Sequence, residues 1–243
     1  ALWVHLYGGN VLDTQLSDGR RLRLLQKTEY PWDGEVRLHI EELAAGKPFS
    51  IMLRIPAWAS DASIRVNGKP AGAEAIAGCY ATLRRPWAAG DFVELTLPMK
   101  VRLIRANPLV EELRGQVAVM RGPVLYCLES VDLPDGIDVM DVLVPGDADF
   151  KPRFDKDLLG GVVVLEGEAV HLENARWLDG RYDSETLYED ASRLKVRPIS
   201  LRLIPYHAWL NRGPSTMSVW MPVALRGSDT AGETKSNGKG TSR

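Results

Sequence analysis

Residues 35–40 read Glu-Val-Arg-Leu-His-Ile, a run in which every second side chain is apolar. Side chains of an extended strand point alternately to the two faces of a sheet, so this period of two predicts a strand with one buried face. Residues 21–25, 63–66 and 92–97 repeat the pattern, and turn-forming residues close each run. Long runs with the 3.6-residue period of a helix are scarce. We therefore expect an all-β protein.

Turn-forming residues separate the expected strands at short intervals. Asn67-Gly68 tolerates the positive φ angles of a type I′ turn and predicts a tight hairpin after residue 66. Arg121-Gly122-Pro123 separates two apolar runs, residues 116–120 and 124–128, and predicts a tight bend between buried strands. Short strands joined in this way predict consecutive antiparallel β-sandwiches of a jelly-roll-like type.

Length and composition divide the chain into three parts. The 243 residues are enough for two sandwich domains, and a hydrophobic content of 45% gives each a core. We expect the first β-sandwich domain at residues 1–105 and the second at 106–225. Residues 226–243 are mostly polar and small, so a disordered C-terminal tail is expected there. Because Ala1 runs directly into a strand-like segment without a methionine, we also expect a missing upstream piece.

The charge balance argues against two classes of partner. Lys and Arg number 30 against 32 Asp and Glu, so the net charge of -2 leaves no basic surplus to neutralise phosphates. No stretch approaches the ~20 apolar residues that a membrane span needs. We expect neither nucleic acid nor a membrane as a partner. The low cysteine content fits the cytoplasm and the periplasm equally.

Familiar catalytic signatures are absent from the sequence. It has no Gly-x-Ser-x-Gly elbow, and its histidines and cysteines are too dispersed for a metal motif. Cys79 and Cys127 lie in apolar contexts that predict small buried side chains, and a disulfide between them stays open. Spacing singles out no carboxylate pair for glycoside hydrolysis. The candidates weighed are Glu41, Glu42, Glu111, Glu112, Glu185, Glu189 and Asp190. We predict no catalytic and no metal residue.

Tryptophan is the better indicator of a binding site, because its ring can stack on the apolar face of a sugar. Three tryptophans in or beside strand patterns are expected to fill cores, namely Trp58, Trp87 and Trp220. Trp32, Trp177 and Trp209 lie in loop-like settings. We predict these last three as carbohydrate-binding residues.

Several segments in a fixed order resemble one enzyme family. They include LWVHLY at residues 2–7, YPWDG at 30–34, LRIPAW at 53–58, GQVAVMRGPVLYCLE at 115–129 and IPYHAWLNRG at 204–213. Together they resemble glycoside hydrolase family 127, the bacterial β-L-arabinofuranosidase group. The resemblance covers most of residues 1–222.

This resemblance implies that the catalytic residues and the β-sandwiches lie in different domains. Family members carry an N-terminal (α/α)6 barrel followed by β-sandwich domains, and the resemblance places this chain in the sandwiches. It further implies a retaining mechanism with a zinc-bound cysteine nucleophile, a glutamate and further cysteine ligands, all carried by the barrel. Cys79 and Cys127 do not match that motif. No cofactor is therefore expected in this chain, and zinc is expected only in the missing barrel.

Three functions follow as hypotheses. The leading one is an accessory module that packs on the missing N-terminal barrel, supports it and contributes to a homodimer contact or to the edge of the substrate cleft. It predicts an exposed apolar patch where the barrel docks. The second is an independent carbohydrate-binding module that uses the loop tryptophans. The third is a glycosidase that acts through an unidentified carboxylate pair.

Overall fold

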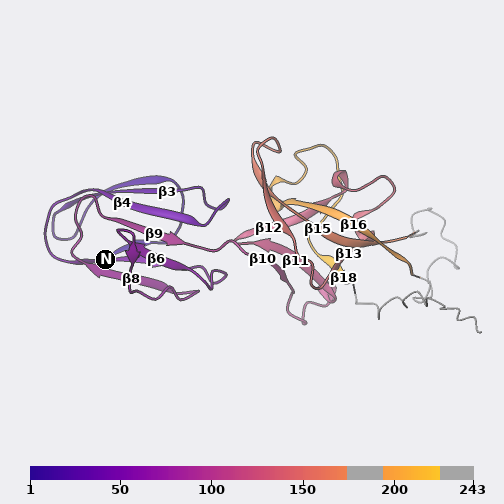
Figure 1. Cartoon of the computed structure of the whole chain (residues 1–243), viewed down its shortest axis with the longest axis horizontal. Helices are drawn as coiled ribbons and strands as arrows, with labels where there is room; N and C mark the ends of the chain where they lie inside the picture. The colour runs from indigo at the N-terminus through magenta and orange to yellow at the C-terminus, as the bar shows by residue number, and fades with distance from the viewer. Residues whose placement is uncertain (174–193, 225–243) are drawn as a thin grey trace, which may run out of the picture.

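The computed structural model describes residues 1–173 and 194–224, and within them the chain is built from β-strands and short 3-10 turns (Figure 1). The predicted all-β class is confirmed. The predicted disordered tail lies outside the described residues. Figure 1 shows two lobes along the long axis, and the chain crosses from one to the other between β9 and β10. In the described part of the chain, no helix has the length and apolarity to cross a membrane.

The first lobe contains two sheets. A six-stranded sheet has the order β2-β3-β4-β9-β6-β7, and a three-stranded sheet has the order β1-β5-β8. The strands are β1 (Leu2–Val4), β2 (Asn10–Gln15), β3 (Arg21–Thr28), β4 (Glu35–Leu43), β5 (Phe49–Arg54), β6 (Ser63–Val66), β7 (Lys69–Pro70), β8 (Tyr80–Arg85) and β9 (Phe92–Thr96). The β1–β5 pair is parallel, whereas the other pairs of this lobe are antiparallel.

Alternation along the strands explains why the two sheets pack face to face. In β4, Val36, Leu38 and Ile40 are each at most 2% exposed, while the residues between them reach solvent. Ile51 and Leu53 of β5 meet them in the same hydrophobic cluster from the opposite sheet. The hairpin expected at Asn67-Gly68 joins β6 to β7, with φ angles of 52° and 74° at its two central residues.

The second lobe is one nine-stranded sheet that closes on itself. Its pairings run β11-β18-β13-β15-β16-β12 and return to β11, because β11 also pairs with β12. The strands are β10 (Val101–Ile104), β11 (Gln116–Arg121), β12 (Val124–Glu129), β13 (Val142–Pro145), β14 (Lys151–Asp155), β15 (Val162–Leu172), β16 (Val196–Pro205), β17 (Met217–Ser218) and β18 (Met221–Ala224). The β13–β18 pair is parallel. Closure removes the open edges of the ring strands and surrounds a second core.

Short 3-10 turns punctuate this lobe: η1 (Glu111–Leu113), η2 (Ser130–Asp132), η3 (Val139–Asp141) and η7 (Tyr206–Ala208). η1 precedes β11, the first strand of the closed ring in chain order. Residues 139–141 form η3, and β13 begins directly after it at Val142. The domain limit at residues 105 and 106 stays a prediction, and the strand just before it, β10, pairs with β11 of the second lobe.

Candidate functional site

Trp32, predicted from its loop setting, lies where the two lobes meet. Its side chain packs, partly buried, against an apolar cluster of the second lobe that includes Cys127 and Ile204. Its ring centroid is 5.9 Å from that of His207. Its carbonyl oxygen accepts a hydrogen bond of 2.8 Å from Nη1 of Arg121. Trp32 therefore joins a loop of the first lobe to the second.

Trp209 packs against the same apolar cluster as Trp32, from the segment that follows η7. Its indole Nε1 is buried and has no hydrogen-bond partner among the described residues. Trp177 lies outside the described residues. The structure thus gathers two of the three predicted tryptophans at one cluster, and their role as carbohydrate-binding residues stays a prediction.

The tryptophans expected in cores differ in burial. Trp87 is 3% exposed and its Nε1 donates to the carbonyl of Phe49 at 3.1 Å, which confirms the expectation. Trp58 is half-buried against the first core. Trp220 is also half-buried.

Three of the carboxylates weighed for glycoside hydrolysis lie beside arginines, and a fourth, Glu112, is exposed. Glu41 accepts from Nε of Arg23 at 2.8 Å, and Glu111 accepts from Arg114 at 3.2 Å. Glu42 lies 3.9 Å from Arg21. Glu185, Glu189 and Asp190 lie outside the described residues. An ion-paired, partly exposed carboxylate is an ordinary surface feature.

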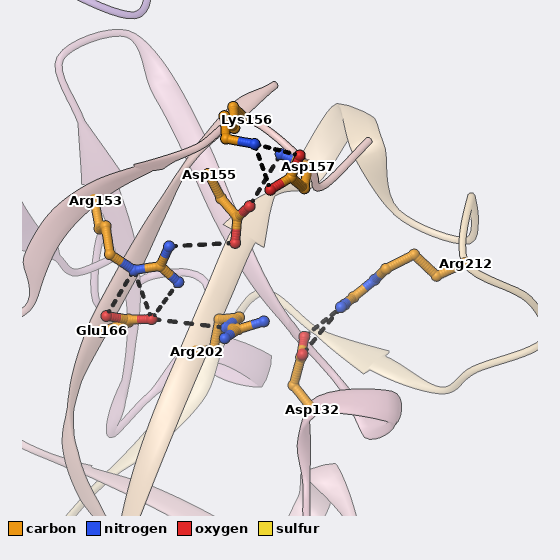
Figure 2. Close-up of polar contacts among 8 residues, drawn as sticks. All are labelled: Asp132, Arg153, Asp155, Lys156, Asp157, Glu166, Arg202 and Arg212. Carbon is orange, nitrogen blue, oxygen red and sulfur yellow. Dashed lines mark hydrogen bonds and ion pairs between the residues drawn. The ribbon is translucent and has the colours of Figure 1, made fainter. Parts of the chain in front are cut away.

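A denser group of charges covers β14 and β15, and Figure 2 shows it. Arg153 donates to Glu166 at 2.7 Å and to Asp155 at 3.3 Å, and Arg202 lies 3.8 Å from Glu166. The hydrogen bond from Arg153 holds the pKa of Glu166 below its ordinary range. A general acid of a glycosidase needs the opposite shift. Glu166 therefore remains ionised at neutral pH and does not suit that role.

The most buried ion pairs tie the chain after η7 to the end of β12. Glu129 is fully buried and accepts from the Leu210 N–H at 3.0 Å, from Nε of Arg212 at 3.1 Å and from the Ser215 hydroxyl at 2.9 Å. Nη1 of Arg212 also donates to Asp132 at 2.9 Å (Figure 2). Burial acts to raise the pKa of Glu129, but these hydrogen bonds outweigh it and hold the pKa below its ordinary value. The network fixes the loop and has no group free for chemistry.

Both cysteines are free thiols. Cys127 is fully buried, as expected, and burial raises its pKa to about 12, so it is a protonated thiol at neutral pH. The expected burial of Cys79 is wrong, because this residue lies exposed in the turn before β8. Among residues 1–173 and 194–224, no three His, Cys, Asp or Glu side chains gather as a metal site. The described residues do not fit the zinc that the resemblance places in the barrel.

A pocket of about 710 Å³ lies between the β6–β7 hairpin and β8. Lys69, Arg84 and Arg85 line it, and in the described part of the chain none of the three forms an ion pair. The guanidinium of Arg85 lies 5.2 Å from the ring centroid of Trp87. The charge of this pocket suits an anionic or hydroxyl-rich ligand better than a cationic one.

The whole described fold matches one family in two consecutive pieces. Residues 1–99 match the middle domain of the β-L-arabinofuranosidases of glycoside hydrolase family 127, and residues 101–222 match the C-terminal domain of the same family. The chain belongs to glycoside hydrolase family 127. It thereby corresponds to two non-initial domains of that family.

The proteins that this chain resembles are considerably longer than the chain itself. A non-reducing end β-L-arabinofuranosidase of Bifidobacterium longum is 38% identical in an alignment of 215 residues, and the match covers 82% of this chain and 30% of the relative. The crystal structure of a β-L-arabinofuranosidase from Geobacillus stearothermophilus T6 aligns at 40% identity with a TM-score of 0.79, covering 91% of this chain and 33% of that one. A structure described as a glycoside hydrolase aligns at 40% identity with a TM-score of 0.83, covering 92% and 36%. The chain spans about a third of these relatives.

Proposed function

We propose that this chain is the β-sandwich portion of a longer bacterial glycoside hydrolase resembling β-L-arabinofuranosidase, in which it supports a catalytic domain that precedes it. The observation that carries the proposal is the match to a middle and a C-terminal domain, together with coverage of only about a third of each relative. The relatives whose activity is named carry, besides the part that matches this chain, additional sequence roughly twice as long as the chain.

The chemistry of the described residues supports an accessory role. A retaining glycosidase needs an activated nucleophile and an acid/base group held together. Cys127 is buried as a neutral thiol, and Glu166 and Glu129 are held ionised by arginines. Cys127 and Glu129 have no access to substrate, and an ionised Glu166 cannot serve as the general acid. In this proposal the catalytic groups, and the zinc, belong to the preceding domain.

The junction between the lobes supports the same role, because a supporting module must present a defined surface. Arg121 holds the backbone of Trp32 across the junction. A Cβ atom on Gly122 would lie 2.5 Å from Sδ of Met99, so the β11–β12 turn fits closely against the end of the first lobe. These contacts favour one relative arrangement of the two lobes.

The proposal is tested first on the purified chain alone. Release of p-nitrophenol is measured from a panel of glycosides that includes the β-L-arabinofuranoside, and calorimetry measures binding of arabinose-containing oligosaccharides. We expect no turnover, with or without added zinc. Turnover by the chain alone would overturn the proposal and return attention to a carboxylate pair.

Carbohydrate binding is the second candidate function, favoured by the partial exposure of Trp32 and Trp209 and by the basic pocket beside β8. Binding without turnover in the same calorimetry would support it, and the variants Trp32→Ala and Trp209→Ala would locate the site. A homodimer contact is a further prediction of the accessory role, and light scattering of the purified chain measures it directly.

A further inference from the structure

Three aromatic rings lie exposed on the outer face of the β1-β5-β8 sheet. Trp3 is 49% exposed and Tyr80 is 36% exposed, and their ring centroids are 4.9 Å apart in an edge-to-face arrangement. The ring of His5 lies 5.6 Å from that of Tyr80, and Nδ1 of His5 is 2.6 Å from the tyrosine hydroxyl. Trp3 lies on β1, His5 follows the end of β1, and Tyr80 begins β8, so the rings come from either side of the central strand β5.

Two further exposed apolar side chains lie close to these rings in the sequence. Leu6, which directly follows His5 in the chain, is 76% exposed, and Ile76, in the turn that leads to Tyr80, is 55% exposed. The opposite face of the same sheet is already filled by the first core. On the outer face, the outward side chains of β5 and β8 around the rings include Ser50, Arg54, Thr82 and Arg84. Exposed apolar side chains rimmed by polar residues mark an interaction surface.

We propose that these five residues, Trp3, His5, Leu6, Ile76 and Tyr80, form the surface on which the domain preceding the middle domain packs. This inference rests on the proposed function and names the surface through which the chain supports its catalytic domain. We call the five residues the aromatic patch.

Two observations select this occupant. The family model that begins at residue 1 is that of a middle domain, and the relatives are about three times as long as this chain, so family 127 proteins carry substantial sequence ahead of it. The first strand of the middle domain, β1, contributes Trp3 to the aromatic patch. A polypeptide that enters the middle domain therefore arrives beside the patch, and Figure 1 shows the N-terminus on the β8 side of the first lobe.

The geometry of the rings fits a protein partner better than a sugar. A platform for sugars offers open, parallel ring faces, whereas Trp3 and Tyr80 meet edge to face at an interplanar angle of 77°. The polar edges of His5 and Tyr80 are directed at each other and not at a hydroxyl-bearing ligand. Rigid, pre-arranged Trp and Tyr side chains are characteristic of the energetic centre of protein interfaces.

Hydroxyl-radical footprinting tests the proposal on the full polypeptide that contains this chain. The oxidation rates of Trp3 and Tyr80 are compared between the chain alone and the full polypeptide, with Phe154 of β14, 58% exposed on the other lobe, as the internal control. We expect the first two residues to be protected severalfold in the full polypeptide, while the rate of Phe154 changes little. Equal oxidation of Trp3 and Tyr80 in both proteins would overturn the proposal.

A pair of variants of the full polypeptide gives a second readout. Trp3→Ser removes the largest ring of the patch, whereas Phe154→Ser removes a comparably exposed ring elsewhere. We expect Trp3→Ser to lower the melting temperature of the full polypeptide by more than it lowers that of the chain alone, and Phe154→Ser to lower both equally. If Trp3→Ser lowers the melting temperature of the full polypeptide and of the chain alone equally, the proposed docking surface is wrong.

The activity of the full polypeptide separates this inference from the proposed function. If glycosidase activity depends on the presence of this chain but Trp3 and Tyr80 remain unprotected, only the aromatic patch is wrong. If activity persists when the chain is deleted, the proposed function fails, and the patch fails with it. Loss of oligosaccharide binding in Trp3→Ser, without protection of the ring, would assign the patch to carbohydrate and overturn the inference.

Discussion

The substitution Arg212→Met should be among the most destabilising that a single arginine of this chain can undergo. The Arg212 side chain is 17% exposed and bridges Glu129 and Asp132, which are 0% and 9% exposed. Methionine retains much of the apolar volume but leaves both carboxylates without their cation. Breaking a buried ion pair in this way costs about 3 to 5 kcal/mol. With an m value on the order of 2 kcal/mol per molar urea, the midpoint falls by roughly 1.5 to 2.5 M.

Arg153→Met is the matched control, because Arg153 also bridges two carboxylates but is 44% exposed. Solvent screens such pairs, so we expect a loss below about 1 kcal/mol. Equilibrium urea unfolding followed by circular dichroism measures both variants, and hydrogen exchange of peptides from β12 assigns the change to the second lobe. If Arg212→Met costs no more than Arg153→Met, the buried network does not hold the second lobe together.

The double variant Glu129→Gln/Arg212→Met tests the cause of the loss. Glutamine keeps the size and an acceptor oxygen of the buried side chain but carries no charge. If the cost of Arg212→Met comes from an uncompensated buried carboxylate, the double variant should be more stable than the single one. A double variant that is less stable would show that packing, and not charge, dominates.

Lowering the pH should weaken the same network of Glu129 and Arg212. The folded-state pKa of Glu129 lies below its ordinary value, so its contribution to stability is complete above the unfolded pKa and is lost as the pH falls through the folded one. We expect the melting temperature of the wild-type protein to drop as the pH falls below about 4.3, the ordinary pKa of a glutamate. In Arg212→Met the melting temperature should fall less steeply with decreasing pH than in the wild-type protein. An equally steep fall in Arg212→Met would contradict the assignment of the acid effect to this network.

Two further predictions concern packing and thiols. In Gly34→Ala the new Cβ would lie 1.8 Å from the carbonyl oxygen of Leu97, so we expect the free energy of unfolding to fall by about 1 to 3 kcal/mol. In the control Gly8→Ala the new Cβ meets nothing within 4 Å, so we expect no change. Thermal melting compares the two variants. Ellman's reagent should titrate one thiol in the native chain, exposed Cys79, and both thiols in urea, because Cys127 is buried and its pKa is raised to about 12. Two fast thiols in the native protein would contradict the burial of Cys127.

Local features of the fold could be predicted from the sequence because they depend on neighbouring residues. The alternation of Val36, Leu38 and Ile40 is enough to define β4 and its buried face. The Asn67-Gly68 turn follows from the backbone freedom of two adjacent residues. In both cases the physical cause lies within a few residues of its effect.

Features that depend on distant segments could not be predicted. Ring closure of the second lobe requires β11 to pair with both β12 and β18, and β18 lies about a hundred residues further along the chain. The parallel pairs β1–β5 and β13–β18 are likewise long-range choices. Cys79 has apolar neighbours in sequence but occupies an exposed turn, so local composition gave the wrong burial.

The functional residues show the same division. The aromatic content pointed to the tryptophans, but the junction role of Trp32 depends on Arg121, which is 89 residues away. The network of Glu129 and Arg212 joins residues 83 apart, and the only sequence signal was that each lies in a segment resembling the family. Trp3 and Tyr80 come together across β5, a neighbourhood that no spacing in the sequence reveals.

The central claim is that this chain supports catalysis in family 127 without performing it. The most direct measurement compares hydrolysis of p-nitrophenyl β-L-arabinofuranoside by three proteins: the full polypeptide, the chain of 243 residues alone, and the full polypeptide with the chain deleted. We predict activity in the full polypeptide and none in the chain alone. In the full polypeptide with the chain deleted, we predict loss of stable activity. Activity in the chain alone, or undiminished activity after its deletion, would contradict the account.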